Sequence, residues 1–208
     1  MGYIKVPMAI ENRSFEIIEE EMGPHNFTQD ELQVVKRVIH TTADFDYGNI
    51  IYISPTAIES AMKVLQKGAK IYTDTNMALS GINKIALGKL GCEIACYVND
   101  DGVRKEAKER NITRSIVGVE KAVAEGFDFF VFGNAPTALY TLKELTEQGV
   151  ANPKFIVGAP VGFVGAAESK EEVEKLSVPM ITIRGRKGGS NVSAAIVNAL
   201  LYMVTNRE

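Results

Sequence analysis

The chain has 208 residues, of which 46% are hydrophobic and 24% charged. This composition is typical of globular proteins and excludes a disordered or fibrous chain. A net charge of −3 and the absence of tryptophan argue against a nucleic-acid-binding protein. No apolar run approaches the roughly 20 residues of a membrane span, and the first residues lack the apolar core of a signal peptide. We therefore expect a cytoplasmic protein with neither nucleic-acid nor membrane partners.

Two helices and no strand are predicted in the first 48 residues. The first extends from about Glu11 to Met22. The second starts at Thr28, and Glu31 follows three residues later, as in a capping box. Its apolar stripe consists of Leu32, Val35, Val38 and Ile39. We interpret residues 1–48 as a helical arm packed on an α/β core, and residues 1–208 as a single domain.

Six short apolar runs in the rest of the chain predict strands. They are Ile50–Ile53, Lys70–Thr73, Glu93–Val98, Phe129–Phe132, Phe155–Val157 and Met180–Ile183. The runs are continuous rather than alternating, which is typical of strands buried on both faces. Helical patterns lie between them at Pro55–Leu65, Pro136–Leu145 and Val192–Val204. The alternation predicts a three-layer α/β/α domain with a flavodoxin-like, largely parallel sheet of five or six strands.

The two cysteines, Cys92 and Cys96, are predicted to lie on one face of the third strand. We interpret them as small buried side chains without a disulfide bond. With two histidines and two cysteines in the chain, a His/Cys metal site is not expected.

His40 lies near the end of the second predicted helix, and Arg37 is on the same helix face three residues earlier. A helix C-terminus stabilises a nearby positive charge. One interpretation is therefore a general acid beside an anion-binding arginine. The alternative is a solvated helix end at which the histidine contacts the last carbonyl groups. His25, after Gly23-Pro24, is interpreted as a loop residue.

Three glycine-rich segments, Gly133–Thr137, Gly158–Gly165 and Arg184–Asn191, each follow a predicted strand. Ligands of open α/β sheets bind at this edge, where glycine permits close approach and helix N-termini offer free N–H groups. The last segment contains Arg184, Arg186 and Lys187 with no acidic residue nearby, which predicts an anion site. A turn that only caps the final helix is the alternative.

Several other features are less specific. Arg114 is interpreted either as another anion contact or as part of a surface salt bridge. Asp74, after the second strand, is interpreted as a helix N-cap, whereas Asp44 and Asp46 have either a structural or a catalytic role. The chain contains no P-loop, dinucleotide fingerprint, nucleophile elbow or HExxH motif.

Five segments together carry a resemblance to a known family. They are Arg13–Phe15, Arg37–His40, Gly133–Leu139, Val157–Lys170 and Arg184–Ser190. In this order they resemble the precorrin-8X methylmutases and their cobalt-precorrin-8 counterparts of corrin biosynthesis, over nearly the whole chain. Val157–Lys170 is the most specific segment.

The resemblance implies an isomerase of vitamin B12 (cobalamin) biosynthesis. Such an enzyme moves a methyl group from C-11 to C-12 of precorrin-8 or cobalt-precorrin-8 and gives hydrogenobyrinate or cobyrinate. It also implies a homodimer, a polycarboxylated tetrapyrrole substrate, hand-over to neighbouring enzymes of the pathway, and no cofactor, since any cobalt belongs to the substrate. A non-catalytic corrinoid carrier, or an α/β enzyme that binds a phosphorylated ligand, is the alternative.

The family's catalytic histidine corresponds to His40, and its substrate-contacting serine and arginine correspond to Ser14 and Arg37. The glycine-rich segments and Arg114 supply the remaining contacts that we expect. The complete expected substrate-binding set is Ser14, Arg37, Arg114, Gly133, Asn134, Thr137, Gly162, Arg184, Arg186, Gly188 and Ser190. No residue is expected to bind a metal ion.

Overall fold

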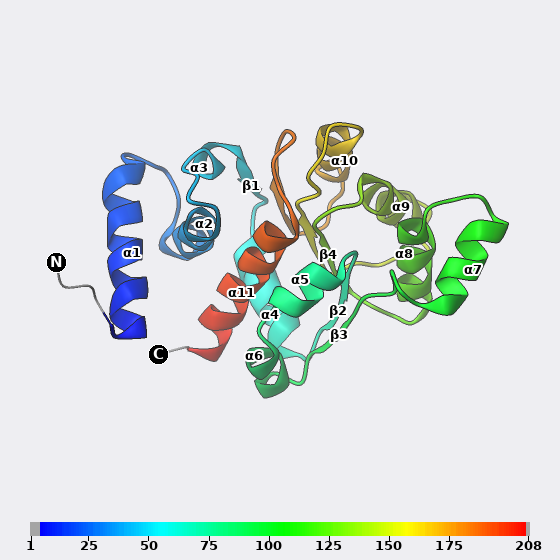
Figure 1. Cartoon of the computed structure of the whole chain (residues 1–208), viewed down its shortest axis with the longest axis horizontal. Coiled ribbons are helices and arrows are strands. Elements are labelled where there is room, and N and C mark those ends of the chain that lie inside the picture. The colour runs from blue at the N-terminus through cyan, green and yellow to red at the C-terminus, as the bar shows by residue number, and fades with distance from the viewer. Residues whose placement is uncertain (1–4, 207–208) are drawn as a thin grey trace.

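A six-stranded sheet forms the centre of the computed structural model, which describes residues 5–206 (Figure 1). Residues 1–4 lie outside this range. The prediction that the chain lacks a signal peptide rests partly on them. The strands are β1 (Ile51–Ile53), β2 (Lys70–Thr73), β3 (Glu93–Ala95), β4 (Phe129–Phe132), β5 (Phe155–Gly158) and β6 (Met180–Ile183). All six coincide with predicted apolar runs.

The strand order is β1-β6-β5-β4-β2-β3. The last five of these strands pair in parallel, whereas β1 pairs with β6 in antiparallel orientation at one edge. Counted along the chain, the five parallel strands lie in the order 2-1-3-4-5, which is the flavodoxin-like order. The predicted fold class is therefore confirmed. The chain changes direction across the sheet between β2 and β4, the switch point at which such sheets bind ligands.

Both faces of the sheet are buried, because successive side chains of each strand enter different apolar clusters. Helices α4 (Ala57–Gln66), α6 (Lys84–Lys89) and α11 (Ser190–Thr205) cover one face, and α5 (Asn76–Gly81) packs on α11. Helices α8 (Arg114–Ala124), α9 (Pro136–Glu147) and α10 (Ala166–Val173) cover the other, with α7 (Asp101–Glu109) beside α8. Within residues 5–206, none of the helices is long and apolar enough to cross a membrane.

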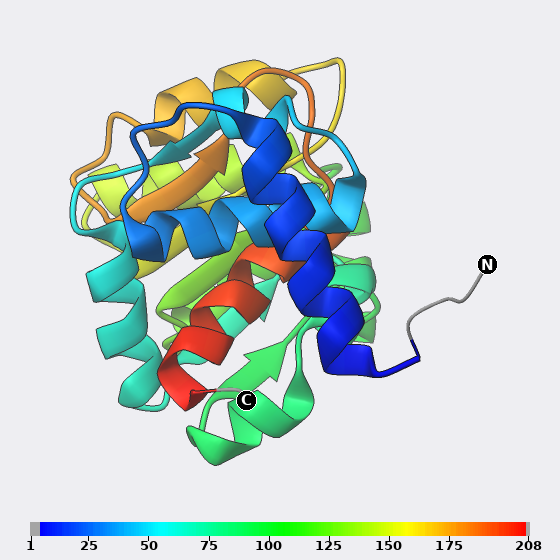
Figure 2. The ribbon, with the colours of Figure 1, turned by 90° about the vertical axis from the view of Figure 1, so that its left-hand side faces the viewer.

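The arm consists of α1 (Pro7–Met22), α2 (Gln29–Thr42) and the short α3 (Tyr47–Ile50). Helix α1 starts earlier than predicted, with a proline in its first turn, where no N–H partner is lost. The capping box of α2 is confirmed by reciprocal hydrogen bonds between Thr28 and Glu31. Val35 and Val38 of α2 join the apolar cluster that contains α11, and Figure 2 shows α1 crossing on the outside.

The third strand is shorter than predicted. It covers only Glu93–Ala95, so Cys92 and Cys96 flank it rather than lie within it. Both thiols are free and half-buried rather than buried. The Cys92 Sγ lies 3.4 Å from the carbonyl oxygen of Leu65.

Candidate active site

A buried carboxylate joins the ends of β2 and β4 at the switch point. Asp74 directly follows β2 and is 3% exposed. Its Oδ1 accepts a hydrogen bond from Gly133 N at 2.8 Å, and its Oδ2 accepts from Asn134 N at 2.9 Å and Ala135 N at 2.7 Å. Burial raises the pKa of this carboxyl, and the three N–H donors counteract the rise. Asp74 thus holds the loop that carries two predicted binding residues.

The prediction that Asp74 caps the following helix is wrong. Thr75 is the N-cap of α5, and its Oγ1 accepts from Ala78 N at 3.1 Å. The same Oγ1 lies 2.7 Å from Oγ of Ser190, the first residue of α11. Gly133 packs against this helix end so closely that a Cβ would lie 2.6 Å from Ser190 Cα. The ends of β2, β4 and β6 are thereby joined.

A pocket of about 480 Å³ opens beside these loops. Among its lining residues are Asp74, Arg114 at the start of α8, and Asn134. Arg114 Nη1 donates to the carbonyl oxygen of Val98 at 3.0 Å. No carboxylate of residues 5–206 forms an ion pair with it, so the predicted alternative of a surface salt bridge is not found there. Thr137 Oγ1 lies 3.2 Å from Oγ1 of Thr113 in the same wall.

Two further glycine-rich loops lie against each other along the same sheet edge. They are the β5–α10 loop (residues 159–165) and the β6–α11 loop (residues 184–189). Gly162 N donates to Arg186 O at 3.1 Å, and Gly189 N donates to Ala159 O at 2.8 Å. Gly188 has a φ of +149°, and a Cβ there would lie 2.3 Å from Ala159 O, so only glycine fits.

The three cations of the β6–α11 loop are not the uniform group that the sequence predicts. The Arg184 guanidinium is bound by Glu174, through Nε at 3.1 Å and Nη2 at 2.9 Å, which raises its pKa. The prediction of no nearby acid is therefore wrong, because Glu174, the residue after α10, lies beside this loop in the fold. Arg186 instead lies over the ring of Phe163, 5.5 Å from its centroid, and Phe163 is 82% exposed. In the part of the chain that the structure describes, Arg186 has no ion pair.

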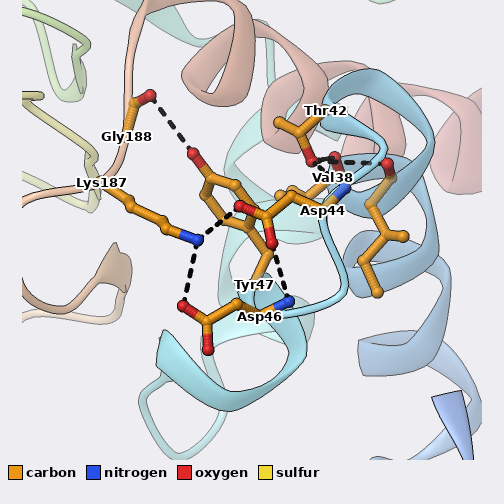
Figure 3. A network of polar contacts seen from close by, with 8 residues as sticks. Val38, Thr42, Asp44, Asp46, Tyr47, Lys187 and Gly188 are labelled. Carbon is orange, nitrogen blue, oxygen red and sulfur yellow. Dashed lines mark hydrogen bonds and ion pairs between the residues drawn. The ribbon is translucent and has the colours of Figure 1, made fainter.

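Lys187 connects the β6–α11 loop to the arm, as Figure 3 shows. Its ammonium lies between the carboxylates of Asp44 and Asp46, and these two acids raise its pKa. Beside it, the hydroxyl of Tyr47 donates to Gly188 O at 3.4 Å. The two aspartates attach the arm to the loop, which agrees with the structural one of their two predicted roles.

The predicted residues of the arm gather around Phe15. His40 is exposed in the last turn of α2, and its ring centroid lies 5.5 Å from that of Phe15 in an edge-on arrangement. The Arg37 guanidinium lies 4.8 Å from the Phe15 ring centroid, and its Nη2 binds Glu11 Oε1 at 2.6 Å. Ser14, next to Phe15, is half-buried and donates back to its own helix at 2.8 Å.

The predicted site residues therefore form two groups within one chain. Ser14, Arg37 and His40 belong to the arm, whereas Arg114 and Asn134 line the pocket at the switch point. Figure 1 shows the arm on one side of the sheet and α8 on the other. The two glycine-rich loops follow β5 and β6. In the strand order of the sheet, these strands lie between β4, at the pocket, and β1, the strand that follows the arm.

Three helix N-termini at this edge offer N–H groups that no side chain caps. Helices α9, α10 and α11 follow β4, β5 and β6, and in the described chain none has a side-chain cap. Helices α5, α6, α7 and α8 are capped by Thr75, Asn83, Asp100 and Thr113. Uncapped first-turn N–H groups, together with the helix dipole, favour anions. The edge is therefore suited to carboxylate groups of a ligand.

Sequence analysis missed one buried lysine. Lys170 is 0% exposed and donates to Pro160 O at 3.0 Å and Lys187 O at 2.9 Å. It lies on the same face of α10 as the buried Ala166 and Val173, four residues before and three after it. The available signal was the helical spacing of Lys170 from the apolar Ala166 and Val173, in a segment for which no helix was predicted.

Comparisons with known proteins agree over nearly the whole chain. A family model described as CbiC, precorrin-8X methylmutase, matches residues 9–203. The cobalt-precorrin-8 methylmutase of Salmonella typhimurium is 49% identical over 97% of this chain and 98% of its own length. That of Leptospira interrogans is 47% identical over 95% and 94%. The crystal structure of precorrin-8x methyl mutase from Thermus thermophilus matches with a TM-score of 0.89 and 38% identity, over 96% and 97% of the two chains.

Proposed function

The chain belongs to the CbiC family of precorrin-8X methylmutases, and on this basis we propose that it moves a methyl group from C-11 to C-12 of cobalt-precorrin-8. As a member of this family it is a methylmutase, an isomerase of cobalamin biosynthesis. The resemblance found in the sequence is thus confirmed. The comparisons give no support to a corrinoid carrier or to an enzyme that binds a phosphorylated ligand.

The edge of the sheet at the ends of β4, β5 and β6 is the observation that carries this proposal. The acetate and propionate groups of a tetrapyrrole require several separate cationic and N–H donors. The uncapped N-termini of α9, α10 and α11 supply N–H donors there, and Arg114 and Arg186 supply cations without ion pairs among residues 5–206. The backbones of Gly133, Gly162 and Gly188, and the side chains of Asn134, Thr137 and Ser190, complete the proposed binding surface.

His40 is the proposed general acid. The methyl group breaks its bond to C-11 and forms a bond to C-12 of the same molecule, so substrate and product are isomers. A protonated imidazole beside a ring nitrogen draws electron density away from the migration centre in the transition state. The exposed position of His40 in the last turn of α2 supports this role, because a ligand can reach it. Ser14 and Arg37, beside the same Phe15, are proposed to contact the substrate.

The substrate is proposed to carry cobalt. The two relatives named cobalt-precorrin-8 methylmutase are 49% and 47% identical to the chain, whereas the Thermus thermophilus protein, named without cobalt, is 38% identical. An isomerisation within one molecule requires no acceptor, reductant or nucleotide, so we propose no cofactor. The cobalt belongs to the substrate and the product.

A cytoplasmic homodimer is the proposed working form, with hand-over of the product to the next enzyme of the pathway. The separation of the two groups of site residues supports the dimer. A second copy of the chain can bring the arm of one subunit to the switch-point pocket of the other.

Conversion of cobalt-precorrin-8 by the purified protein tests the proposal. We expect an absorbance change as the methyl group migrates, and mass spectrometry should find a product of the same mass as the substrate. Precorrin-8X, assayed in parallel, should be converted more slowly. Tight binding of cobyrinate without turnover of either substrate would instead identify a carrier.

A further inference from the structure

The ammonium group of Lys170 lies between the β5–α10 loop and the β6–α11 loop. Its side chain is 0% exposed, and its two hydrogen bonds go to a carbonyl of each loop, Pro160 O and Lys187 O. Burial of a cation is costly unless polar groups surround it. The two carbonyl oxygens provide that environment, and they must lie close together to do so.

The remaining contacts between these loops are few: two backbone hydrogen bonds and the Arg186 guanidinium over the exposed ring of Phe163. Gly162 N donates to Arg186 O, and Gly189 N donates to Ala159 O. Lys170 lies among these contacts and bridges the two loops from α10, with one hydrogen bond to each loop. Gly162 belongs to one loop, and Arg186 and Gly188 belong to the other, so the distance between the loops sets the shape of the surface that the three residues form.

Helix α10 gives this lysine a fixed base. Glu174, the residue after the helix, accepts hydrogen bonds from Thr182 and Arg184. These bonds attach the C-terminal end of α10 to β6 and its following loop. Together with the buried Ala166 and Val173 of α10, these bonds fix the backbone of Lys170 relative to β6 and the core of the protein.

We propose that Lys170 is a positioning residue for the methylmutase reaction, whose ammonium binds Pro160 O and Lys187 O and so holds the two glycine-rich loops at the separation that the tetrapyrrole requires. This inference rests on the proposed function. Lys170 does not touch the substrate; it acts through Gly162, Arg186 and Gly188.

Hydrogen exchange of the substrate-free protein provides the first test. Lys170→Met keeps the length of the side chain and removes the ammonium. We expect the amides of Gly162 and Gly189 to exchange roughly tenfold faster or more, with the strand amides unchanged. Lys175→Met, which removes an exposed ammonium just beyond the same helix, is the matched control and should leave both amides unchanged.

Steady-state kinetics with cobalt-precorrin-8 provides the second test. Because the loops bind the substrate and His40 lies elsewhere, Lys170→Met should raise KM roughly tenfold, with kcat changed by less than about threefold. Lys170→Arg keeps a cation with several donors and should restore part of the affinity. A residue that only supports the fold would lower the melting temperature without this selective rise in KM.

Four results would overturn the proposal. The first two concern hydrogen exchange: unchanged exchange of the Gly162 and Gly189 amides in a folded Lys170→Met protein, or amides that are already unprotected at both positions in the wild type. The third is faster exchange of these amides in Lys170→Met with an unchanged KM. The fourth is failure of both Lys170 variants to fold. If the wild type converts neither tetrapyrrole, the proposed function fails, whereas the exchange experiment still decides whether Lys170 holds the loops.

Discussion

The guanidinium of Arg184 donates hydrogen bonds to the Oε2 of Glu174 from Nε at 3.1 Å and from Nη2 at 2.9 Å. Glu174 is largely buried, with 12% of its side chain exposed, so the arginine neutralises a charge that solvent does not reach well. Arg184 is therefore engaged within the protein, in contrast to its neighbour Arg186. The two arginines form a natural pair for comparison.

Arg186→Ala should weaken binding of cobyrinate by roughly 10- to 100-fold, because one charge-assisted hydrogen bond is worth about 1.5–3 kcal/mol. Arg184→Ala should weaken it less and lower the free energy of unfolding by about 1–3 kcal/mol, because the largely buried Glu174 loses its guanidinium partner. Titration of the product by absorbance and urea denaturation measure the two effects. If both variants lose the same affinity for cobyrinate and Arg184→Ala is as stable as the wild type, the ligand displaces Glu174 from Arg184.

His40→Ala should lower turnover roughly a hundredfold or more, the usual effect of losing a general acid. The affinity for cobyrinate should remain close to that of the wild type, because the carboxylate contacts lie elsewhere. Single-turnover conversion of cobalt-precorrin-8 is the measurement, with circular dichroism to check folding. His25→Ala removes the other, exposed histidine and should have no effect. Wild-type conversion by folded His40→Ala would leave His40 as a solvated helix end.

Gly133→Ala should destabilise the protein by roughly 1–3 kcal/mol, because the new Cβ would lie 2.6 Å from Ser190 Cα and neither backbone can give way cheaply. Gly88→Ala is the control. Gly88 lies in α6 with nothing within 4 Å of the new Cβ, so this change should stabilise the protein by about 0.5–1 kcal/mol. Urea denaturation compares them, and similar values for both would contradict the close packing of β4 on α11.

Lys170 should make stability depend on pH in the alkaline range. Burial lowers the pKa of its ammonium from 10.5 to about 8. Between these values the unfolded chain binds more protons than the native one, so this group favours folding increasingly as the pH rises, by at most about 1.4 kcal/mol per pH unit. The free energy of unfolding of the wild type minus that of Lys170→Met should therefore increase from pH 8 to pH 10. A difference that stays constant or decreases with pH would contradict a lowered pKa for Lys170.

Mixing of two defective subunits should restore activity if the site is shared between copies. His40→Ala and Arg114→Ala each affect one of the two groups of residues. Co-expressed in equal amounts, they should reach about a quarter of the wild-type rate at low substrate concentration, because half of the dimers are mixed and each has one intact site of two. Each variant alone is the control. No gain on mixing would place both groups in the site of one chain.

Local patterns in the sequence predict the fold well because each strand is a continuous apolar run. Tyr72 and Phe130 face one layer of helices while Ile71 and Phe129 face the other, so both alternate positions must be apolar. The capping box at Thr28 and the proline at the start of α9 are equally local, and both were predicted correctly. No range was predicted for α3, α5, α6, α7, α8 or α10. The shortest of these, α3, has four residues, which contain too little periodicity.

Partners from distant parts of the chain explain most of what sequence reasoning missed at the site. The acids that bind Lys187 lie 143 and 141 positions earlier, and no spacing rule connects them. Asp74 was interpreted as a helix cap from the residues next to it in the sequence. Its carboxylate instead binds backbone amides about 60 residues further along the chain. The predicted role of Ser14 comes from the resemblance alone, whereas those of His40 and Arg37 were also one of two interpretations of their place on the helix. All three roles stay predictions.

The packing of α2 on α11 has a consequence for synthesis of the protein on the ribosome. The apolar stripe of α2 is among the first parts of the chain to be made, but α11, against which it packs, is the last helix to emerge. The attachment of Tyr47 to Gly188 likewise spans 141 residues. A nascent chain that ends before Ser190 therefore leaves this stripe without its main partner, and truncated chains of that length should be sensitive to proteases and should bind chaperones.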